Sequence, residues 1–537
     1  MGAVVPVRLQ FVKRFALLVI PALLAANLAM ASGTSVVLAG GNVGAITVRV
    51  LGGPLGNITT RPLTLSPAFD QATTDYVLRC HAGVNAVQVT LSAASAGKIA
   101  VGKDRGPSVA IKVNLVENQA LVISGPSQGP SNDSSASRQT DSASRGNAQY
   151  WIRCLPHDFP LLRVRGPGTP WPGWYLTGNV TSASGSGTYA MVLDSKGTPV
   201  WYRKAAGPGA INITPLSNQT IGWNSFAGSV PGANPGGAFE VYNLVTGITR
   251  WLAAPVSPTD FHELLPMTQG GFIMLSSPIR LGVDMSSFGG SSSSAIDDCV
   301  IQEVDSQGGL VWEWRASDHI SVTESSHPTP TVSGGLTVYD LFHCNSIDAD
   351  PTTGNLLLSV RHTDSVYLID RTTGRVIWRL GGVGPNRDNA QLLTISADPQ
   401  GSFHAQHDAR FQPNGDVSLY DNQSWDPGDA ARAVEYQIDA ASGIAALVWS
   451  YRAPDGKNSL ATGSFRRLHR EADNIVCWGF KLGAPLFTEV DSAGQLLLEV
   501  RFLSGEGAYR VVKVGLNALD ANALRASAGL PQFVAAG

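Results

Sequence analysis

The most regular pattern in the chain is a phrase of two apolar, strand-like runs separated by a short polar turn. Each copy has an apolar run, an Asp or Asn, a turn with glycine, and a second run that is mostly rich in aromatic residues. The turn favours left-handed backbone and the runs have high β propensity, so each copy predicts a β-hairpin. Six copies lie about 50 to 70 residues apart: 189–203, 239–252, 301–315, 366–380, 435–451 and 487–501.

Between these hairpins the sequence predicts further hairpins, with turns of the Asn-Gly or Gly-Gly kind. Examples are 264–276, 347–361 and 409–422. Two hairpins per period give a four-stranded unit, and such units at this spacing are typical of propeller blades. We therefore expect an all-β chain in which residues 149–515 form a six-bladed β-propeller, rather than an array of β-sandwiches with similar turns.

The segment before the propeller has a different pattern. Residues 34–125 alternate β-branched and small polar residues, as in 87–91, which predicts a half-buried antiparallel sheet. The stretch 65–80 resembles the opening of small cadherin-like domains, so we expect a small N-terminal β-sandwich. Residues 126–148 are rich in Ser, Gly, Pro and Asp and predict a flexible linker.

The two ends of the chain carry shorter signals. Basic residues precede an apolar run and an Ala-x-Ala cleavage motif, so residues 1–31 predict a secretory signal peptide. A membrane-anchored N-terminus is the less favoured alternative, because the run is short for a membrane span and Pro21 interrupts it. We expect a secreted, periplasmic or lumenal protein with no stable membrane span after cleavage. Residues 516–537 predict a C-terminal tail or short helix.

Charge and cysteine content narrow the function classes. The formal net charge is −3, without the concentrated basic excess of a nucleic-acid-binding protein. Five cysteines suit an oxidising compartment, although their number is odd and the sequence does not fix their pairing. Cys80 and Cys154 lie on either side of the linker and could join two domains. Cys299 and Cys477 lie in strand-like runs and are expected to be buried thiols.

Three histidines occupy one register position in successive predicted blades: His262, His343 and His407. The first strand of each blade lines the central channel of a propeller, where ligand sites form. A single histidine in a strand is more often structural, but three in register favour a functional site. His404 is out of phase with them and is not expected to share their face.

Asn345 and Arg361 are expected in the same blade as His343. Asn345 would share the strand face of His343, and Arg361 would add a guanidinium, so the group would form an oxyanion pocket. A zinc site is disfavoured, because Asp408 should point away from the face of His407 and the arginine would repel a cation. No Gly-x-Ser-x-Gly motif occurs at a strand-to-helix turn, so a histidine nucleophile fits better than a serine.

Three segments that carry these residues resemble signature segments of the arylsulfotransferase family. They are 342–361, 366–382 and 406–422, and the resemblance covers about residues 150–510. It implies a six-bladed propeller with a small N-terminal β-sandwich. It also implies ping-pong transfer of a sulfuryl group from a phenolic sulfate to a phenol, without a cofactor or a metal.

The resemblance also implies a role for each residue of the site. His407 matches the nucleophile, and His262 matches a further histidine that acts as an acid, a base or an oxygen-binding group. Thr462 or Ser464 falls near a substrate-binding hydroxyl. The residues that would bind the sulfuryl oxygens are His343, Asn345 and Arg361.

Two alternatives remain open from the sequence. One is a non-catalytic, secreted propeller that binds a ligand or partner, and the other is a hydrolase or lyase acting on an anionic ester. The expected partners are small molecules, an aryl sulfate and a phenol, and the oligomeric state is open, a homodimer included. Unlike some bacterial members, the chain has no close cysteine pair near His407, and Cys344 is expected to point away from the channel.

Overall fold

The computed structural model describes most of the chain in two compact units, 1–157 and 158–537. The signal peptide expected at 1–31, and all but Ala148 of the expected linker, lie outside the described residues. The described residues are 35–39, 43–50, 65–93, 98–101, 103–125, 148–180, 185–226, 237–333, 335–384, 387–425, 428–468, 473–481 and 483–529.

The first unit contains two sheets, with strand orders β3-β9-β8-β1-β5-β6 and β2-β4-β7. The period-2 pattern is visible in β4, where Val87, Val89 and Leu91 are buried and the residues between them are half-buried. They join a core with apolar residues of the other sheet, such as Leu121 and Ile152. The strands are β1 (Ser35–Ala39), β2 (Val43–Val50), β3 (Asp75–Arg79), β4 (Asn85–Ala93), β5 (Ile99–Val101), β6 (Asp104–Gly106), β7 (Ser108–Leu115), β8 (Ala120–Gly125) and β9 (Ala148–Leu155).

The strand β9 belongs to the first unit, although the sequence placed its residues at the start of the propeller. It pairs with β3 and β8, so the division of the chain falls after residue 157 rather than after 148. Cys80 and Cys154 form a disulfide within this unit. The pairing of Cys80 with Cys154 that the sequence suggested is confirmed, but the bond lies within one unit and does not join two.

In the second unit, each of the six repeat copies forms an antiparallel hairpin. Asp194 shows why the turn is stable, since its Oδ1 accepts from the backbone N–H groups of Lys196 (2.9 Å) and Thr198 (2.8 Å). Gly197 takes the left-handed position with φ 77°. The hairpins are β12 (Tyr189–Leu193) with β13 (Pro199–Lys204), β16 (Phe239–Asn243) with β17 (Thr249–Leu252), β22 (Val300–Val304) with β23 (Leu310–Arg315), β28 (Ser365–Ile369) with β29 (Val376–Gly381), β33 (Arg432–Asp439) with β34 (Ile444–Arg452), and β37 (Phe487–Val490) with β38 (Leu496–Phe502).

A second set of hairpins pairs with the first to give four-stranded antiparallel sheets. The three further hairpins expected from the sequence are among them, as β18–β19, β26–β27 and β31–β32. The members of this set are β14 (Gly209–Leu216) with β15 (Thr220–Phe226), β18 (Thr259–Pro266) with β19 (Phe272–Ser276), β26 (Cys344–Ala349) with β27 (Leu356–Val360), β31 (His407–Phe411) with β32 (Val417–Asp421), and β35 (Ser464–Leu468) with β36 (Asp473–Cys477).

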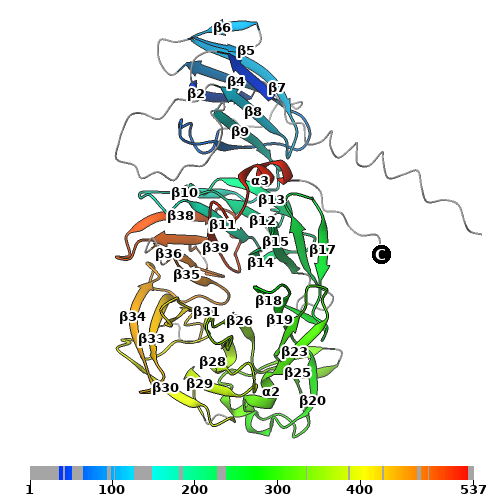
Figure 1. The fold of residues 1–537 in the computed structure, drawn as a ribbon, viewed down its shortest axis with the longest axis vertical. Coiled ribbons are helices and arrows are strands. Elements are labelled where there is room, and N and C mark those ends of the chain that lie inside the picture. The colour runs from blue at the N-terminus through cyan, green and yellow to red at the C-terminus, as the bar shows by residue number, and fades with distance from the viewer. Residues whose placement is uncertain are drawn as a thin grey trace, which may run out of the picture. The chain divides into compact units, whose positions relative to one another are not determined.

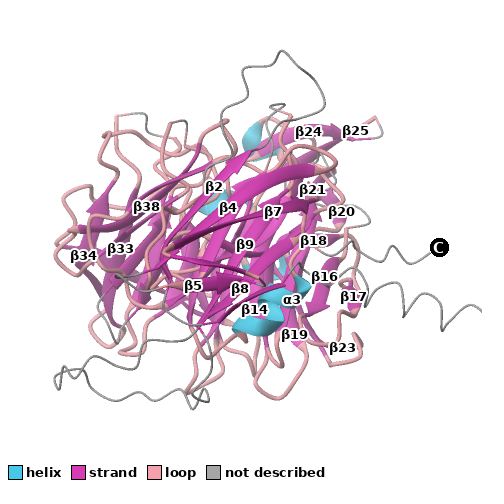
Figure 2. Ribbon diagram, turned by 90° about the horizontal axis from the view of Figure 1, so that it is seen from above, coloured by secondary structure: helices cyan, strands magenta, loops and turns pink. Residues whose placement is uncertain are grey.

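The two ends of the second unit are hydrogen-bonded to each other. The C-terminal strand β39 (Val512–Gly515) pairs with β11 (Gly173–Gly178), and β10 (Leu162–Arg165) pairs with β38. The first strands β14, β18, β26 and β31 contact one another in turn, and Figure 1 shows them around a common centre. The arrangement is propeller-like, and Figure 2 shows that it is nearly all β.

A few elements depart from this plan. A separate sheet holds β20 (Ile279–Val283), β21 (Ser294–Asp297), β24 (Thr329–Ser333) and β25 (Leu336–Asp340), and β30 (Gln391–Ser396) links two neighbouring four-stranded sheets. The described helices are short: α2 (Ala316–His319), α3 (Ala521–Ser527) and the 3-10 turns η1 (Ser286–Phe288), η2 (Val322–Glu324) and η3 (Arg361–Thr363). Of the C-terminal tail or short helix expected at 516–537, residues Ala521–Ser527 form the helix α3. Among the described residues, no helix has the length and apolar character needed to span a bilayer.

Candidate active site

The three histidines predicted in register all lie at the start of first strands. His262 lies in β18, His343 directly precedes β26, and His407 is the first residue of β31. The pairing of each of these strands with its neighbour has a β-bulge or register shift at this point. The shift lies between residues 260 and 264 in β18, between 344 and 346 in β26, and between 407 and 410 in β31. These bulges interrupt the regular alternation of side chains, so the residues near each histidine do not follow a simple two-faced pattern.

His262 and His343 form a pair, with their ring centroids 5.1 Å apart. A carboxylate lies against the Nδ1 of each ring, with Asp260 2.6 Å from His262 and Asp340 2.6 Å from His343. The carboxylates can only accept in their ionised form, so each Nδ1 carries the proton and each Nε2 is left for chemistry. Burial lowers the pKa of His262, although Asp260 opposes that shift.

His407 is buried and held by its Nδ1, which lies 2.8 Å from Asn422 Oδ1 and 3.2 Å from the carbonyl oxygen of Ala405. Both neighbours are acceptors, so Nδ1 is the protonated nitrogen. Nε2 accepts a backbone N–H from Thr462 at 3.2 Å. Burial, followed by the positive charge of Arg361, lowers the pKa of His407 well below its usual value, which keeps the imidazole neutral.

Arg361 begins η3, directly after β27, and supplies a buried cation. Its Nη1 lies 2.9 Å from His362 Nε2, its Nη2 donates to the Leu460 carbonyl at 3.1 Å, and the guanidinium lies 4.4 Å from the Trp425 ring centroid. Its Nε–H is buried and has no partner. Burial lowers the pKa of Arg361 to about 10, so the group stays charged at neutral pH. Within the described ranges, no carboxylate lies at ion-pair distance from it, which favours an anionic ligand.

Two expected substrate-binding residues use their side chains differently from the expectation. Asn345 Nδ2 donates to the Gln406 carbonyl at 2.7 Å, which leaves the acceptor Oδ1 buried and without a partner. An oxyanion needs the reverse orientation of this amide. The hydroxyl of Thr462 donates to the Ala508 carbonyl at 3.1 Å, so the contact of Thr462 with the site is its backbone N–H.

One group of possible metal ligands overlaps the site. Asp340, His343 and His362 each offer an atom within 4.8 Å of the others. However, His362 Nδ1 lies 2.9 Å from the backbone oxygen of Asp340, and its Nε2 faces the Arg361 guanidinium. The hydrogen bond of His343 to Asp340 uses a third nitrogen, and a cation here would lie against the positive charge of Arg361. The donors therefore fit a hydrogen-bonded anion site better than a metal centre.

The second disulfide corrects one expectation from the sequence. Cys299 and Cys344 are bonded, so Cys299 is not a free thiol, and the bond lies next to His343. It joins the residue before β22 to the residue after His343, and so fixes the chain next to that imidazole. Cys477 is a buried free thiol, as predicted.

Sequence reasoning missed the groups that hold the imidazoles. Asp260 lies two residues before His262 and Asp340 lies three before His343, and an aspartate shortly before each histidine was the available signal. Asn422 had no comparable signal, because it reaches His407 from the end of β32. His404 is half exposed and lies 3.5 Å from Asp364, outside the contacts that join the three histidines.

The fold and the site define a propeller-like, all-β protein with a group of imidazoles and one buried arginine where the first strands meet. A family model described as Arylsulfotransferase (ASST) matches residues 173–495. The chain therefore belongs to the arylsulfotransferase family. No curated protein matches it significantly.

Solved structures of low sequence identity resemble the chain in part. One is a protein of unknown function from Bacteroides caccae, with a TM-score of 0.40 and 12% identity over 64% of this chain and 99% of that one. Another is the periplasmic gluconolactonase of Pseudomonas aeruginosa, with a TM-score of 0.34 and 12% identity over 64% of this chain and 84% of that one.

Proposed function

We propose that this protein moves a sulfuryl group from a phenolic sulfate ester to a phenol through a sulfo-histidine at His407. Membership of the arylsulfotransferase family supports sulfotransferase activity in general. The observation that carries the finer proposal is the environment of His407. Its imidazole is neutral, is held at Nδ1 by Asn422, and lies within the field of the Arg361 cation.

In the first half-reaction, the Nε2 lone pair of His407 attacks the sulfur of the donor, and an N–S bond forms. The S–O bond to the aryl group breaks, and its electron pair goes to the phenolate oxygen. The phenolate leaves as an anion and takes a proton from the solvent, because His262 and His343 hold their proton at Nδ1 and present a bare Nε2. Arg361 donates its unpartnered Nε–H to a sulfuryl oxygen as charge shifts during transfer.

In the second half-reaction, Nε2 of His343 or His262 takes the proton of the acceptor phenol as a general base, while Asp340 or Asp260 stabilises the imidazolium, which then returns the proton to the solvent. The oxygen of the phenol attacks the sulfur, the N–S bond breaks, and the electron pair returns to His407 Nε2.

Before the first half-reaction can begin, the donor must displace the backbone N–H of Thr462, which is hydrogen-bonded to the Nε2 lone pair of His407 at 3.2 Å. The displaced N–H is then available to a sulfuryl oxygen.

The same proposal gives a role to the wider fold. Six groups of four adjacent antiparallel strands, two of them joined through β30 and one extended by β10, would be the blades of a six-bladed propeller closed by the pairing of β39 with β11. The two sheets of the first unit would form a small β-sandwich. Cleavage of residues 1–31 would release the protein into an oxidising compartment, in keeping with its two disulfides.

Mass spectrometry of the intact covalent adduct tests the proposal. Purified protein mixed with 4-nitrophenyl sulfate, without an acceptor, should gain one sulfuryl group on the peptide that contains His407. His407→Ala should neither gain the group nor release 4-nitrophenol. The matched control is His404→Ala, three residues away, which should react like the original protein. Adduct formation or undiminished nitrophenol release by His407→Ala would refute the histidine nucleophile.

Adding a phenol separates transfer from hydrolysis. A transferase should release nitrophenol in proportion to the sulfated acceptor formed, and the adduct should disappear when the acceptor is added. Nitrophenol release with inorganic sulfate as the only second product would instead identify a hydrolase.

A further inference from the structure

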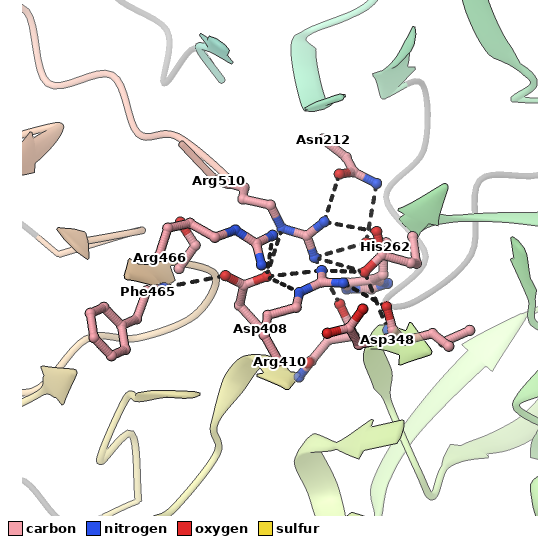
Figure 3. A network of polar contacts seen from close by, with 12 residues as sticks. Asn212, His262, Asp348, Asp408, Arg410, Phe465, Arg466 and Arg510 are labelled. Atoms are coloured by element: carbon pink, nitrogen blue, oxygen red, sulfur yellow. Dashed lines mark hydrogen bonds and ion pairs between the residues drawn. The ribbon is translucent and has the colours of Figure 1, made fainter. Parts of the chain in front are cut away.

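A second group of buried charges lies just beyond the histidines on the same strands. It is made of the residues that follow His262 and His407, namely Glu263 and Asp408, with three guanidiniums from β31, β35 and the chain before β39 (Figure 3). We call Arg410, Arg466 and Arg510, with Glu263 and Asp408, the arginine cluster. It does not include any residue assigned to sulfuryl transfer.

The contacts of the arginine cluster converge on the two carboxylates. Asp408 Oδ1 lies 3.0 Å from Arg410 Nη2, 2.9 Å from Arg466 Nη2 and 3.1 Å from Arg510 Nε. Glu263 binds Arg410 at 2.5 Å and Arg510 at 2.9 Å. Although burial alone would raise the pKa of Glu263, these two arginines lower it to about 2. Glu263 is therefore ionised at neutral pH.

The positive charges of the arginine cluster crowd around one oxygen atom. All three guanidiniums share Asp408 Oδ1, and Arg410 and Arg510 pair in addition with Glu263. A third carboxyl, Asp348, accepts the backbone N–H groups of Ala349 and Phe411. Burial and then the repulsion of Arg410 lower the pKa of Arg466 to about 10. Arg466 is the guanidinium that the surroundings stabilise least.

Arg466 also has hydrogen-bonding capacity to spare and space beside it. Its Nε–H is buried without a partner, whereas the terminal nitrogens of Arg410 and Arg510 are bonded to carboxylates and carbonyl oxygens. Arg466 and Arg467 line a cavity of about 380 Å³, together with Thr214. The side chain of Arg466 keeps 19% of its surface exposed, so the cavity gives a solute access to it. A buried charged donor without an acceptor is costly, and an anion in the cavity would remove that cost.

We propose that the cavity beside Arg466 is a second anion site, which takes a small oxyanion such as inorganic sulfate independently of the histidine site. The anion would accept from Arg466 Nε and add a negative charge beside the guanidinium that shares Asp408 Oδ1 with two others. Arg467, the next residue, forms an ion pair with Glu435 and already has its counter-charge. The pair of neighbouring arginines therefore supplies both the test position and its matched control.

Equilibrium binding of radiolabelled sulfate to the full chain tests the second site. The original protein and Arg467→Gln should each bind two sulfates, whereas Arg466→Gln and Arg361→Gln should each bind one, and the double variant of Arg361 and Arg466 should bind none. Arg466→Gln should still release nitrophenol from 4-nitrophenyl sulfate. If Arg466→Gln does not fold, Arg466→Lys takes its place, since it keeps the charge without the Nε–H and should bind at least about tenfold more weakly.

The outcomes separate this inference from the proposed function. The second site would be overturned if Arg466→Gln still bound two sulfates. It would also be overturned if the original protein bound at most one sulfate and Arg361→Gln lost that one. A failure of His407 to become sulfated would refute the proposed mechanism but leave the count of bound sulfates unchanged.

Discussion

At the scale of single residues, the site depends on which nitrogen of each imidazole is held by a neighbour. Asp340 holds His343, and its pKa is lowered to about 2, because His343 and His362 together outweigh the effect of burial. Asp297 is the partner of Asp340 in the pairing of β21 with β25. Burial and then the charge of Asp340 raise the pKa of Asp297 to about 9, so this carboxyl is uncharged at neutral pH. Two paired aspartates thus have opposite charge states.

The two aspartates predict opposite outcomes for the same substitution. Asp340→Asn removes the charge that supports imidazolium formation at His343, a loss of roughly 1.5–3 kcal/mol, and should lower kcat for aryl sulfate roughly tenfold to a hundredfold. Asp297→Asn replaces an uncharged carboxyl by an amide of similar shape and should change kcat by about twofold at most. Steady-state release of nitrophenol measures both. Equal losses in the two variants would show that Asp340 has no special role.

The pKa of His407 predicts the pH dependence of the first half-reaction. Attack needs neutral imidazole, and burial with Arg361 holds the pKa of His407 well below its usual value. Lowering the pH from 8 to 5 should therefore not slow enzyme sulfation through protonation of His407. Asn422→Asp places a carboxylate against Nδ1, which raises the pKa of His407, so the rate should fall on the acidic side. The rate of the nitrophenol burst in a single turnover, measured from pH 5 to pH 8, gives the pH profile of the original protein and of Asn422→Asp. If the two rates depended on pH in the same way on the acidic side, the assignment of His407 would be contradicted.

At the scale of elements, the bulges and the second disulfide determine where the histidines lie. The loop that Cys299 and Cys344 close has a sequence separation of 45 residues. In the chain-entropy model such a loop stabilises the fold by about 4 kcal/mol. Cys299→Ala should therefore lower the free energy of unfolding of the second unit by up to about that amount, and should reduce activity through movement of His343. Guanidinium unfolding and nitrophenol release measure the two effects.

The matched control for that experiment is Cys477→Ala. Cys477 is buried like Cys299 but is not bonded to another cysteine. The cavity left by the sulfur should cost far less than the disulfide, and activity should be kept. A Cys299→Ala protein no less stable than Cys477→Ala would indicate that the bond does not constrain the unfolded chain.

The elements also show how far sequence reasoning reaches. The hairpins and the register of the histidines could be predicted, because both depend on local turns and on residues spaced along one strand. The bond between Cys299 and Cys344 could not, since it depends on how β22 lies against β26. The charge state of Asp297 depends likewise on the pairing of β21 with β25, which no local pattern records. The register also shifts between Cys344 and Ser346, at the residue on which the expected alternation from His343 to Asn345 depended.

At the scale of the whole molecule, the second unit buries several histidines in a neutral state. Burial lowers the pKa of His262, His362 and His407, with His362 at about 3. In the unfolded chain a histidine titrates near 6.5, so below that pH the unfolded state binds protons that the folded state does not. The stability from these groups is fully present above pH 6.5 and falls as the pH drops below it. Glu263 and Asp340 have pKa values of about 2, so their protonation changes the stability of the fold only below about pH 4.

A change in unfolding free energy between pH 6.5 and pH 5 therefore reports on the histidines and not on these two carboxylates. At pH 5, which is about 1.5 units below the pKa of a histidine in the unfolded chain, protonation of His362 in that chain should lower the unfolding free energy by about 2 kcal/mol. Guanidinium unfolding at pH 7 and pH 5, followed by tryptophan fluorescence, measures the loss in the second unit, because Trp151 is the only tryptophan of the first unit. His362→Gln should reduce the pH effect by that amount, whereas His157→Gln, at an exposed position of the first unit, should leave it unchanged. An equal pH effect in all three proteins would mean that His362 takes up its proton in the folded state, which its contact with the Arg361 guanidinium opposes.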